Sequence, residues 1–392
     1  MPSVNDMSYM QAATILNNIQ YQVTGRTDPI ENIAPGDFIS IGNTVLAAGY
    51  DKVLNAITQV IGRTLMSIRP YNRKLADLYM TNMEWGSIIR KLKVADSDFE
   101  DAAAFELVDG QSIDQWTVKK SNVLQLNFYG QNVFDLQSDS IFDYQLDAAF
   151  RSPEELNRFF AMVSTRIENQ KEQKNESIAR MILCNFIAGK LAADNGIFHA
   201  LTEYNSDTGS SLTSTTVYSP SNFPDFVYWL YAKLETLAGL MSERSMIFQI
   251  NVAGKPINQH TERQNLKVKM YAPFMNAINA RVRANTFDNT YLKMADTEPI
   301  NFWQNILDPS SINCTPTYLT ESGILTTAQS AVEESGVIGV MYDVDAMGVV
   351  TQKERALATP MNAKGAYSNI WYHWVQKWFT DFTEKGIVIV LD

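Results

Sequence analysis

Histidine is the side chain that most often supplies acid–base chemistry or a metal ligand near neutral pH. This chain has three, at His199, His260 and His373. They are far apart in the sequence, and none belongs to a paired metal motif such as His-Glu-x-x-His. His373 lies between aromatic residues, which is typical of a packed or interface histidine. We therefore predict no catalytic histidine and no metal site.

Nucleophile and phosphate-binding motifs are also missing. No Gly-x-Ser-x-Gly occurs, and the stretch Ala253-Gly254-Lys255-Pro256 lacks the first glycine and the hydroxyl residue of a phosphate-binding loop. Two cysteines, Cys184 and Cys314, are too few for a disulfide framework. Cys184 lies in an apolar helical stretch, so we expect reduced, buried thiols and synthesis in a cytosol. No cofactor is expected.

One segment resembles a calcium-binding loop. Asp343, Asp345, Gly348 and Glu354 have the spacing of loop positions 1, 3, 6 and 12. Met347 would occupy position 5, where it offers no side-chain oxygen, and an apolar strand rather than a helix precedes the loop. A β-turn closed by Gly348 explains the pattern better.

Aromatic residues are dense near the C-terminus. A stacking platform for sugars or bases is one interpretation. A spacing of three and four residues instead favours a packed helix or a large buried interface. The residues concerned are Tyr367, Trp371, Tyr372, Trp374, Trp378, Phe379 and Phe382.

The overall composition describes an acidic, ordered globular protein. Of 392 residues, 45% are hydrophobic and 19% charged, and 43 acidic side chains outnumber 32 basic ones. A protein that neutralises phosphates needs a dense basic surface, so direct nucleic-acid binding is not expected. The first residues lack the pattern of a signal peptide, and no apolar run is long enough to span a membrane. We expect no membrane partner.

The strongest structural signal is a helix that begins near residue 152. Ser152 is a predicted N-cap, Pro153 suits the first helical position, and Glu155 completes a capping box. No glycine follows until Gly189 and no proline until after it. The pattern predicts one helix over 153–191, about 60 Å long, which is longer than most globular helices. Its ends are apolar and residues 166–180 are nearly all polar, which predicts packing at both ends and an exposed middle.

A hairpin is expected before this helix. Residues 85–92 and 116–129 have strand-like patterns, with alternation from Leu124 to Phe128, and an acidic stretch at 96–101 lies between them. A projecting hairpin of about 40 residues is unusual unless something outside the chain receives it.

Further elements complete a mixed pattern. We expect helices over 222–240 and 273–283, an apolar strand over 246–250, a strand over 336–343 that runs into a turn, and a closing strand over 386–391. This mixture predicts the α+β class.

Taken in order, these segments resemble the major capsid proteins of tailed bacteriophages with the Hong Kong 97 type fold, nearest to those of podophages. The sequence resemblance is strongest near the C-terminus. Val337 to Gly348 resembles a strand and turn of that family, and Asn369 to Trp374 with the strand from Gly386 resembles its final segment. The resemblance implies an N-terminal arm at 1–81, an extended hairpin called the E-loop at 82–130, and a peripheral (P) domain at 131–221 that includes a spine helix at 153–191. It also implies an axial (A) domain at 222–342 and a C-terminal part of the P domain at 343–392.

The function that this resemblance implies is structural rather than enzymatic. It is the formation of an icosahedral head around phage double-stranded DNA, from pentamers and hexamers, by a virion protein made in the bacterial host's cytoplasm. The implied partners are copies of the chain, a scaffolding protein, a portal protein at one vertex, and packaged DNA by proximity only. The implied assembly residues of the E-loop are apolar: Trp85, Ile88, Phe99, Phe105, Trp116, Leu124, Leu126 and Phe128.

Two other classes fit part of the pattern. An encapsulin-like nanocompartment shell shares the fold, and only its cargo would distinguish it. An acidic cytosolic hydrolase is the enzyme alternative, and it requires a clustered acid–base pair that the sequence does not show.

Overall fold

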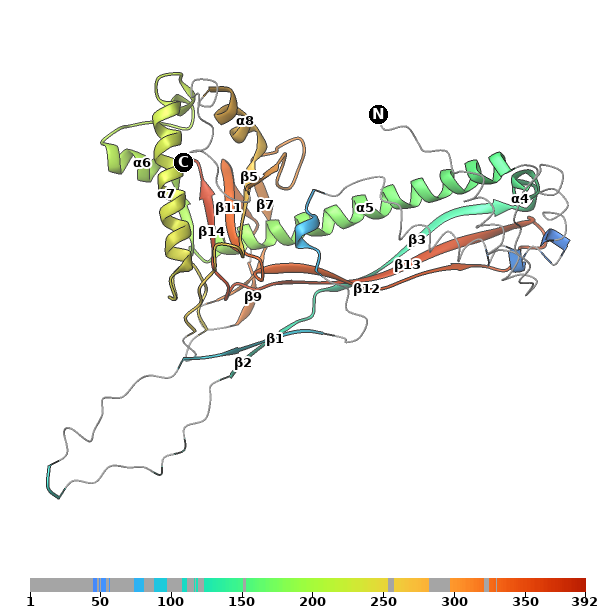
Figure 1. Cartoon of the computed structure of the whole chain (residues 1–392), viewed down its shortest axis with the longest axis horizontal. Coiled ribbons are helices and arrows are strands. Elements are labelled where there is room, and N and C mark those ends of the chain that lie inside the picture. Colours follow the sequence, from blue (N-terminus) through green and yellow to red (C-terminus); the bar gives the residue numbers. More distant parts are fainter. Residues whose placement is uncertain are drawn as a thin grey trace. The chain divides into compact units, whose positions relative to one another are not determined.

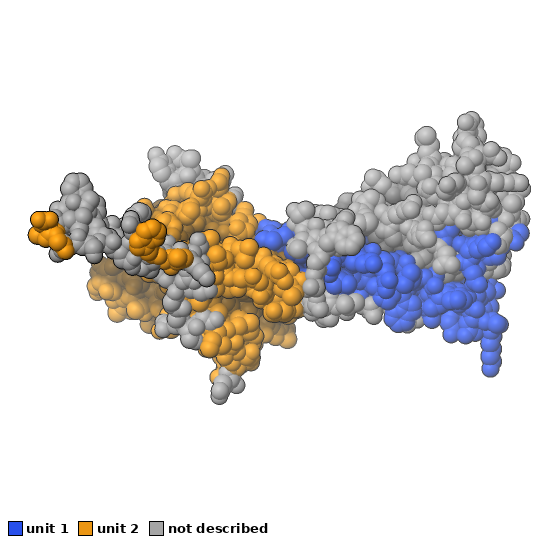
Figure 2. All heavy atoms as spheres, turned by 90° about the horizontal axis from the view of Figure 1, so that it is seen from below, with its two compact units in different colours: residues 1–86, 131–177, 350–377 blue, residues 87–130, 178–349, 378–392 orange. Residues whose placement is uncertain are grey.

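The computed structural model describes residues 45–47, 49, 51–53, 56, 74–80, 88–96, 108–110, 116, 118, 123–150, 153–252, 257–281, 297–320, 324–328 and 330–392. The chain forms two compact units, each made of several segments (Figure 2). Unit 1 comprises residues 1–86, 131–177 and 350–377, and unit 2 comprises residues 87–130, 178–349 and 378–392. Helices and strands are mixed in both, so the predicted α+β class is confirmed.

Unit 1 is built on a three-stranded sheet with the order β12-β13-β3 (Figure 1). Its strands are β3 (Gln131–Phe142), β12 (Met347–Ala358) and β13 (Tyr367–Thr380), of which β12 begins and β13 ends in unit 2. Strands β13 and β3 are antiparallel. The short helices η1 (Ala76–Leu78) and α4 (Asp143–Ala149) and the first part of α5 belong to the same unit.

Helix α5 (Pro153–Ala192) confirms the predicted long helix. Ser152 and the side chain of Glu155 lie outside the described residues, so the capping box stays a prediction. The expected exposure of the middle is wrong, because Ile167, Glu168 and Asn175 are buried. One side of this polar stretch packs within unit 1: Gln376 Nε2 of β13 donates a hydrogen bond to Asn175 Oδ1 at 2.7 Å.

The aromatic segment is a strand, so its interpretation as a helix is wrong. In β13 every second residue from Ser368 to Gln376 is buried, which is the period of two of a strand and not a helical spacing. The buried set includes polar Ser368 and Gln376, which a search for apolar spacing does not detect. These buried aromatics are packing residues within the chain.

Unit 2 is built on a five-stranded sheet with the order β4-β14-β11-β5-β6. The strands are β4 (Ile197–His199), β14 (Gly386–Val390), β11 (Val337–Asp343), β5 (Leu266–Tyr271) and β6 (Thr297–Ile300). The three central strands are antiparallel, and β4 and β6 join the edges in parallel. Strands β11 and β14 confirm the two C-terminal strands that the apolar runs predicted.

Three helices cover this sheet within unit 2: α6 (Ala200–Thr208), α7 (Phe223–Ser242) and α8 (Ala272–Arg281) (Figure 1). They bury a continuous apolar core against β5, β11 and β14, and α7 and α8 confirm the two helices predicted here. The short helix η3 (Thr216–Tyr218) precedes α7. The core includes Phe226, Leu230, Leu234, Val268, Met270, Met341, Ile387 and Ile389.

Two further small antiparallel pairs belong to unit 2. Strand β7 (Ile312–Cys314) pairs with β10 (Val332–Glu334), and β8 (Thr317–Leu319) pairs with β9 (Leu325–Thr327).

The strand expected at 246–250 is absent. This segment is a turn in which Phe248 has a positive φ of 64°. Its backbone oxygen accepts hydrogen bonds from Gly386 N at 2.9 Å and from the buried Lys190 Nζ at 2.8 Å. These partners from distant segments replace a strand ladder.

The C-terminal segment also differs from expectation. Residues 343–349 and 378–392 belong to unit 2 and only residues 350–377 to unit 1, and β14 pairs with β11 of the predicted A domain. The turn after β11 is closed at Ala346, whose backbone N–H donates to Asp343 O at 2.8 Å. Gly348 therefore lies inside β12, and the turn interpretation holds without it. The names P domain and A domain stay predictions.

Candidate functional site

The predicted hairpin is confirmed over 89–94 and 123–128, whereas the described residues Trp116 and Val118 are not in a strand. Its two faces differ. Strands β1 (Ile89–Val94) and β2 (Val123–Phe128) are antiparallel, with Ile89 opposite Phe128 and Val94 opposite Val123. Side chains alternate between faces in a strand. We call the buried side, formed by Ile89, Lys91, Lys93, Leu124, Leu126 and Phe128, the inner face. The exposed side, formed by Arg90, Leu92, Val94, Val123, Gln125 and Asn127, is the outer face.

The apolar residues of the inner face pack on unit 2 of the same chain. Leu124 is buried in a small cluster with Ala95 and Ile257, and Leu126 lies against this cluster. The ring of Phe128 is 5.4 Å from that of Phe379, centroid to centroid. Since the chain itself covers this face, these side chains are not an open surface.

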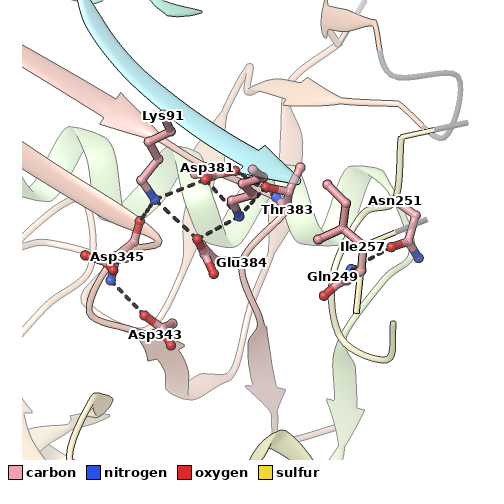
Figure 3. A network of polar contacts seen from close by, with 10 residues as sticks. Lys91, Gln249, Asn251, Ile257, Asp343, Asp345, Asp381, Thr383 and Glu384 are labelled. Atoms are coloured by element: carbon pink, nitrogen blue, oxygen red, sulfur yellow. Dashed lines mark hydrogen bonds and ion pairs between the residues drawn. The ribbon is translucent and has the colours of Figure 1, made fainter. Parts of the chain in front are cut away.

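Two lysines of the inner face enter a buried ionic network (Figure 3). Asp381 Oδ2 is 3.1 Å from Lys91 Nζ and 3.4 Å from Lys93 Nζ. Glu384 Oε1 is 3.4 Å from Lys91 Nζ and 2.7 Å from Lys93 Nζ. The other oxygen of Asp381 accepts hydrogen bonds from the Thr383 hydroxyl at 2.6 Å and the Thr383 N–H at 2.9 Å. Two ammonium groups are thus balanced by two carboxylates.

The pKa directions follow from this balance. Burial acts to raise the pKa of Asp381, but Lys93, Lys91 and the Thr383 hydroxyl outweigh it and hold the pKa below its usual range. Burial acts to lower the pKa of Lys91, but Asp381 and Glu384 outweigh it and raise the pKa. Both groups are therefore charged at neutral pH, and each buried charge has its counter-ion.

A second contact holds the end of β1. Asp96 accepts hydrogen bonds from Asn258 Nδ2 at 2.8 Å and Asn258 N at 3.2 Å, and it forms an ion pair with Arg244. The bonds from Asn258 and then Arg244 lower the pKa of Asp96. Buried Gln249 supports the loop that carries Asn258, because it donates a hydrogen bond to Ile257 O at 2.6 Å (Figure 3). The base of the hairpin is therefore attached at two places.

The outer face is exposed, and its apolar residues lie toward the end of β1 and at the start of β2. Leu92 is 68% exposed, Val94 61% and Val123 45%. In the register, Val94 is opposite Val123 and Leu92 is opposite Gln125, so the three apolar side chains adjoin one another. Exposed apolar groups that adjoin are typical of a surface that binds another protein.

The predicted E-loop residues do not form one surface. Trp85, Phe99 and Phe105 lie outside the described residues. Ile88, just before β1, is partly buried, whereas Leu124, Leu126 and Phe128 belong to the inner face. Trp116 is 83% exposed. The sequence prediction did not include Leu92, Val94 or Val123, although Leu92 and Val94 alternate with Lys91 and Lys93 at the two-residue period of a strand.

The side chains that the sequence offered for acid–base chemistry or metal binding do not gather in the described part of the chain. His199 Nδ1 is 2.7 Å from Asp392 Oδ2 at the surface. Within the part of the chain that the structure describes, no three His, Cys, Asp or Glu side chains gather as a metal site would require. None of the described helices combines the length and apolar character needed to cross a bilayer.

Known proteins with similar sequences or structures agree with this architecture. No curated protein sequence matches the chain. In the capsid structure of Staphylococcus phage Andhra, a chain is similar with a TM-score of 0.52 and 10% identity over 83% of this chain and 84% of that chain. A chain in the structure of the head fiber and inner core protein gp22 of native bacteriophage P68 has a TM-score of 0.53 and 10% identity, over 80% of this chain and 83% of that chain. These likenesses show the fold, which is the Hong Kong 97 type predicted from the sequence.

The family model described as Phi29-like phage major capsid protein matches residues 16–389, nearly the whole chain. The chain therefore belongs to this family, and it is a structural, capsid-forming protein of the phage virion that assembles into a shell with copies of itself.

Proposed function

We propose that copies of this chain form the pentamers and hexamers of an icosahedral phage head, and that the outer face of the β1–β2 hairpin is a contact between neighbouring copies. The observation that supports this most is that the two faces of the hairpin have different surroundings. Its inner face is anchored on its own chain by the Lys91 and Lys93 network, while apolar Leu92, Val94 and Val123 stay exposed. An anchored strand pair presents its exposed face with little loss of conformational entropy on binding.

The proposal assigns no catalytic activity to the chain. Its family is structural, and the buried lysines of the hairpin are paired with Asp381 and Glu384 rather than directed at a substrate. Assembly in the host cytoplasm would use a separate scaffolding protein and a portal protein at one vertex. DNA would be enclosed without dedicated contacts, which suits a chain with 43 acidic and 32 basic residues.

Weak contacts of this kind add up in a closed shell. Each copy is held at several contacts at once, so modest interfaces together stabilise the whole particle. Placing one charge in the centre of such an interface therefore affects every copy, and it would leave that charge desolvated and unpaired in each contact.

The test is assembly of Leu92→Glu with the scaffolding protein co-expressed. We expect soluble subunits with an unchanged urea midpoint and no closed particles by negative-stain microscopy. Gln125→Glu is the matched control, because it adds the same charge opposite Leu92 at a position that is already polar and exposed. Normal particles from Leu92→Glu would contradict the proposed contact. Particles that hold a cargo enzyme and no nuclease-resistant DNA would contradict the phage-head assignment.

A further inference from the structure

Cys184 and Cys314 are the only cysteines of the chain, and they lie next to each other although 130 positions separate them. Cys184 is buried in α5, and Cys314 is partly buried at the end of β7. The Cys314 thiol donates a hydrogen bond to the backbone oxygen of Cys184, with Sγ and O 3.7 Å apart. Both residues belong to unit 2.

Hydrogen bonds of neighbouring residues fix the position of β7 beside the part of α5 that carries Cys184. Asn185, the residue after Cys184, donates through Nδ2 to Thr317 O at 3.1 Å and accepts from Thr317 N at 2.9 Å. This two-fold hydrogen bond holds the segment after β7 along the turn of α5 that carries Cys184. The Cys184 thiol donates a hydrogen bond to Trp303 O at 3.5 Å, and buried Trp303 is itself held by a bond from its indole N–H to Val337 O at 2.8 Å. The Cys314 sulfur is therefore held beside the backbone of Cys184 by the fold.

We propose that Cys184 and Cys314 are a redox modification site, which forms an intrachain disulfide between α5 and β7 once the protein has left the reducing cytosol. The setting rests on the virion location, because disulfides persist in extracellular and virion environments. The site does not depend on the contact proposed for the hairpin.

The oxidant in this proposal is a small-molecule disulfide such as oxidised glutathione. The more accessible Cys314 thiolate attacks one of its sulfurs, the glutathione S–S bond breaks, and one glutathione thiolate leaves. The Cys184 thiolate then attacks Cys314 Sγ and displaces the second glutathione. Two protein thiols lose two protons and two electrons, and one glutathione disulfide becomes two glutathione thiols.

The surroundings make this reaction slow inside a cell. Burial, with a smaller contribution from Cys314, raises the pKa of Cys184 to about 12, and burial also raises the pKa of Cys314. Only a small fraction of either thiol is the reactive thiolate at neutral pH, and this fraction grows about tenfold per pH unit. The thiols would thus stay reduced during synthesis and assembly.

The test uses purified, unassembled full-length protein with excess oxidised glutathione at pH 7, 8 and 9. After an acid quench and alkylation, intact mass and peptide mapping follow the thiols. We expect the wild type to lose two hydrogen atoms, to retain no glutathione, and to yield a joined peptide of Cys184 and Cys314, about tenfold faster per pH unit. The urea midpoint should rise on oxidation and return with dithiothreitol, since the bond closes a long loop.

Two single variants provide the controls. Cys184→Ala should keep one glutathione on Cys314, because the resolving thiol is missing, and its urea midpoint should not rise. Cys314→Ser should react little, because Cys184 is buried. Stable glutathione on wild-type Cys314, or disulfides only between different copies, would overturn the proposal.

Discussion

Lys93 and Leu124 lie directly opposite each other in the β1–β2 register, and both belong to the inner face. The Lys93 ammonium is 2.7 Å from Glu384, while Leu124 packs beside Ile257. One cross-strand pair therefore contributes both an ionic and an apolar contact to the same attachment. This arrangement explains why substitutions on the two faces of the hairpin should have different consequences.

Leu124→Ala should destabilise the subunit, whereas Leu92→Ala should not. Leu124 is 8% exposed and Leu92 68%, so only the first loses buried packing. Removing a buried leucine side chain costs about 2–5 kcal/mol, and the small size of this cluster favours the lower end. Urea unfolding of the two variants measures the difference. Equal free energies of unfolding would show that the assignment of the two faces is wrong.

Asp381→Asn should destabilise the subunit by about 3 kcal/mol, because it leaves Lys91 and Lys93 with one carboxylate in a largely buried site. The comparison is Glu354→Gln, which removes the partner of Lys171 in a more exposed ion pair of 2.6 Å. That change should cost at most about 1 kcal/mol. Urea unfolding at neutral pH measures both, and a ranking in the opposite order would refute the buried network.

Glu168→Gln should stabilise the subunit at high pH only. Both carboxyl oxygens of Glu168 are buried, and neither has a hydrogen-bond partner within the described structure. Burial is the largest cause that raises the pKa of the Glu168 carboxyl from 4.5 to about 7. Lys171 acts to lower this pKa, and Glu172 acts to raise it. A raised folded-state pKa means that wild-type stability is fully present below pH 4.5 and falls as the pH rises to about 7.

The variant's advantage should therefore be near zero at pH 4.5 and about 1–3 kcal/mol at pH 8. Parallel urea titrations of wild type and variant across this range measure it. A difference that does not change with pH would mean that Glu168 does not titrate in the folded protein.

Gly196→Ala should destabilise the subunit more than Gly209→Ala. Both glycines have nearly the same positive φ, 71° and 69°, so the backbone strain of an alanine is the same, about 1–2 kcal/mol. At Gly196 the added Cβ would lie 2.4 Å from the backbone oxygen of Gly386, whereas nothing lies within 4 Å of it at Gly209. Thermal unfolding compares the two, and equal midpoints would contradict the close approach at Gly196.

Local signals in the sequence were enough to predict the long helix and the main C-terminal strands. Helix α5 begins at Pro153 as predicted, because a proline at the first helical position is a local signal. No helix-breaking residue follows until Gly189, so the helix continues. The apolar runs of β11 and β14 are buried on both faces, which makes them readable without knowledge of their partners.

Signals that depend on distant partners were misread. In β13 the polar residues Ser368 and Gln376 lie on the same buried face as Tyr372 and Trp374, so the spacing of the apolar residues alone resembled that of a helix. The polar middle of α5 was expected in solvent, but Gln376 satisfies Asn175 across 201 positions of sequence. A buried polar residue is stable when it has its hydrogen bond, and that partner is not visible locally.

The amino-acid sequence by itself determined that this chain has a long helix, a hairpin before it and an apolar C-terminal sheet, because helix limits and strand periodicity depend on neighbouring residues. Only the tertiary structure decided which face of the hairpin is exposed and that the two cysteines lie next to each other. Both depend on groups brought from far along the chain: Asp381 lies 290 positions from Lys91, and Cys314 lies 130 positions from Cys184. Buried charges and thiols take their surroundings from such long-range packing, which the period of a local sequence pattern does not encode.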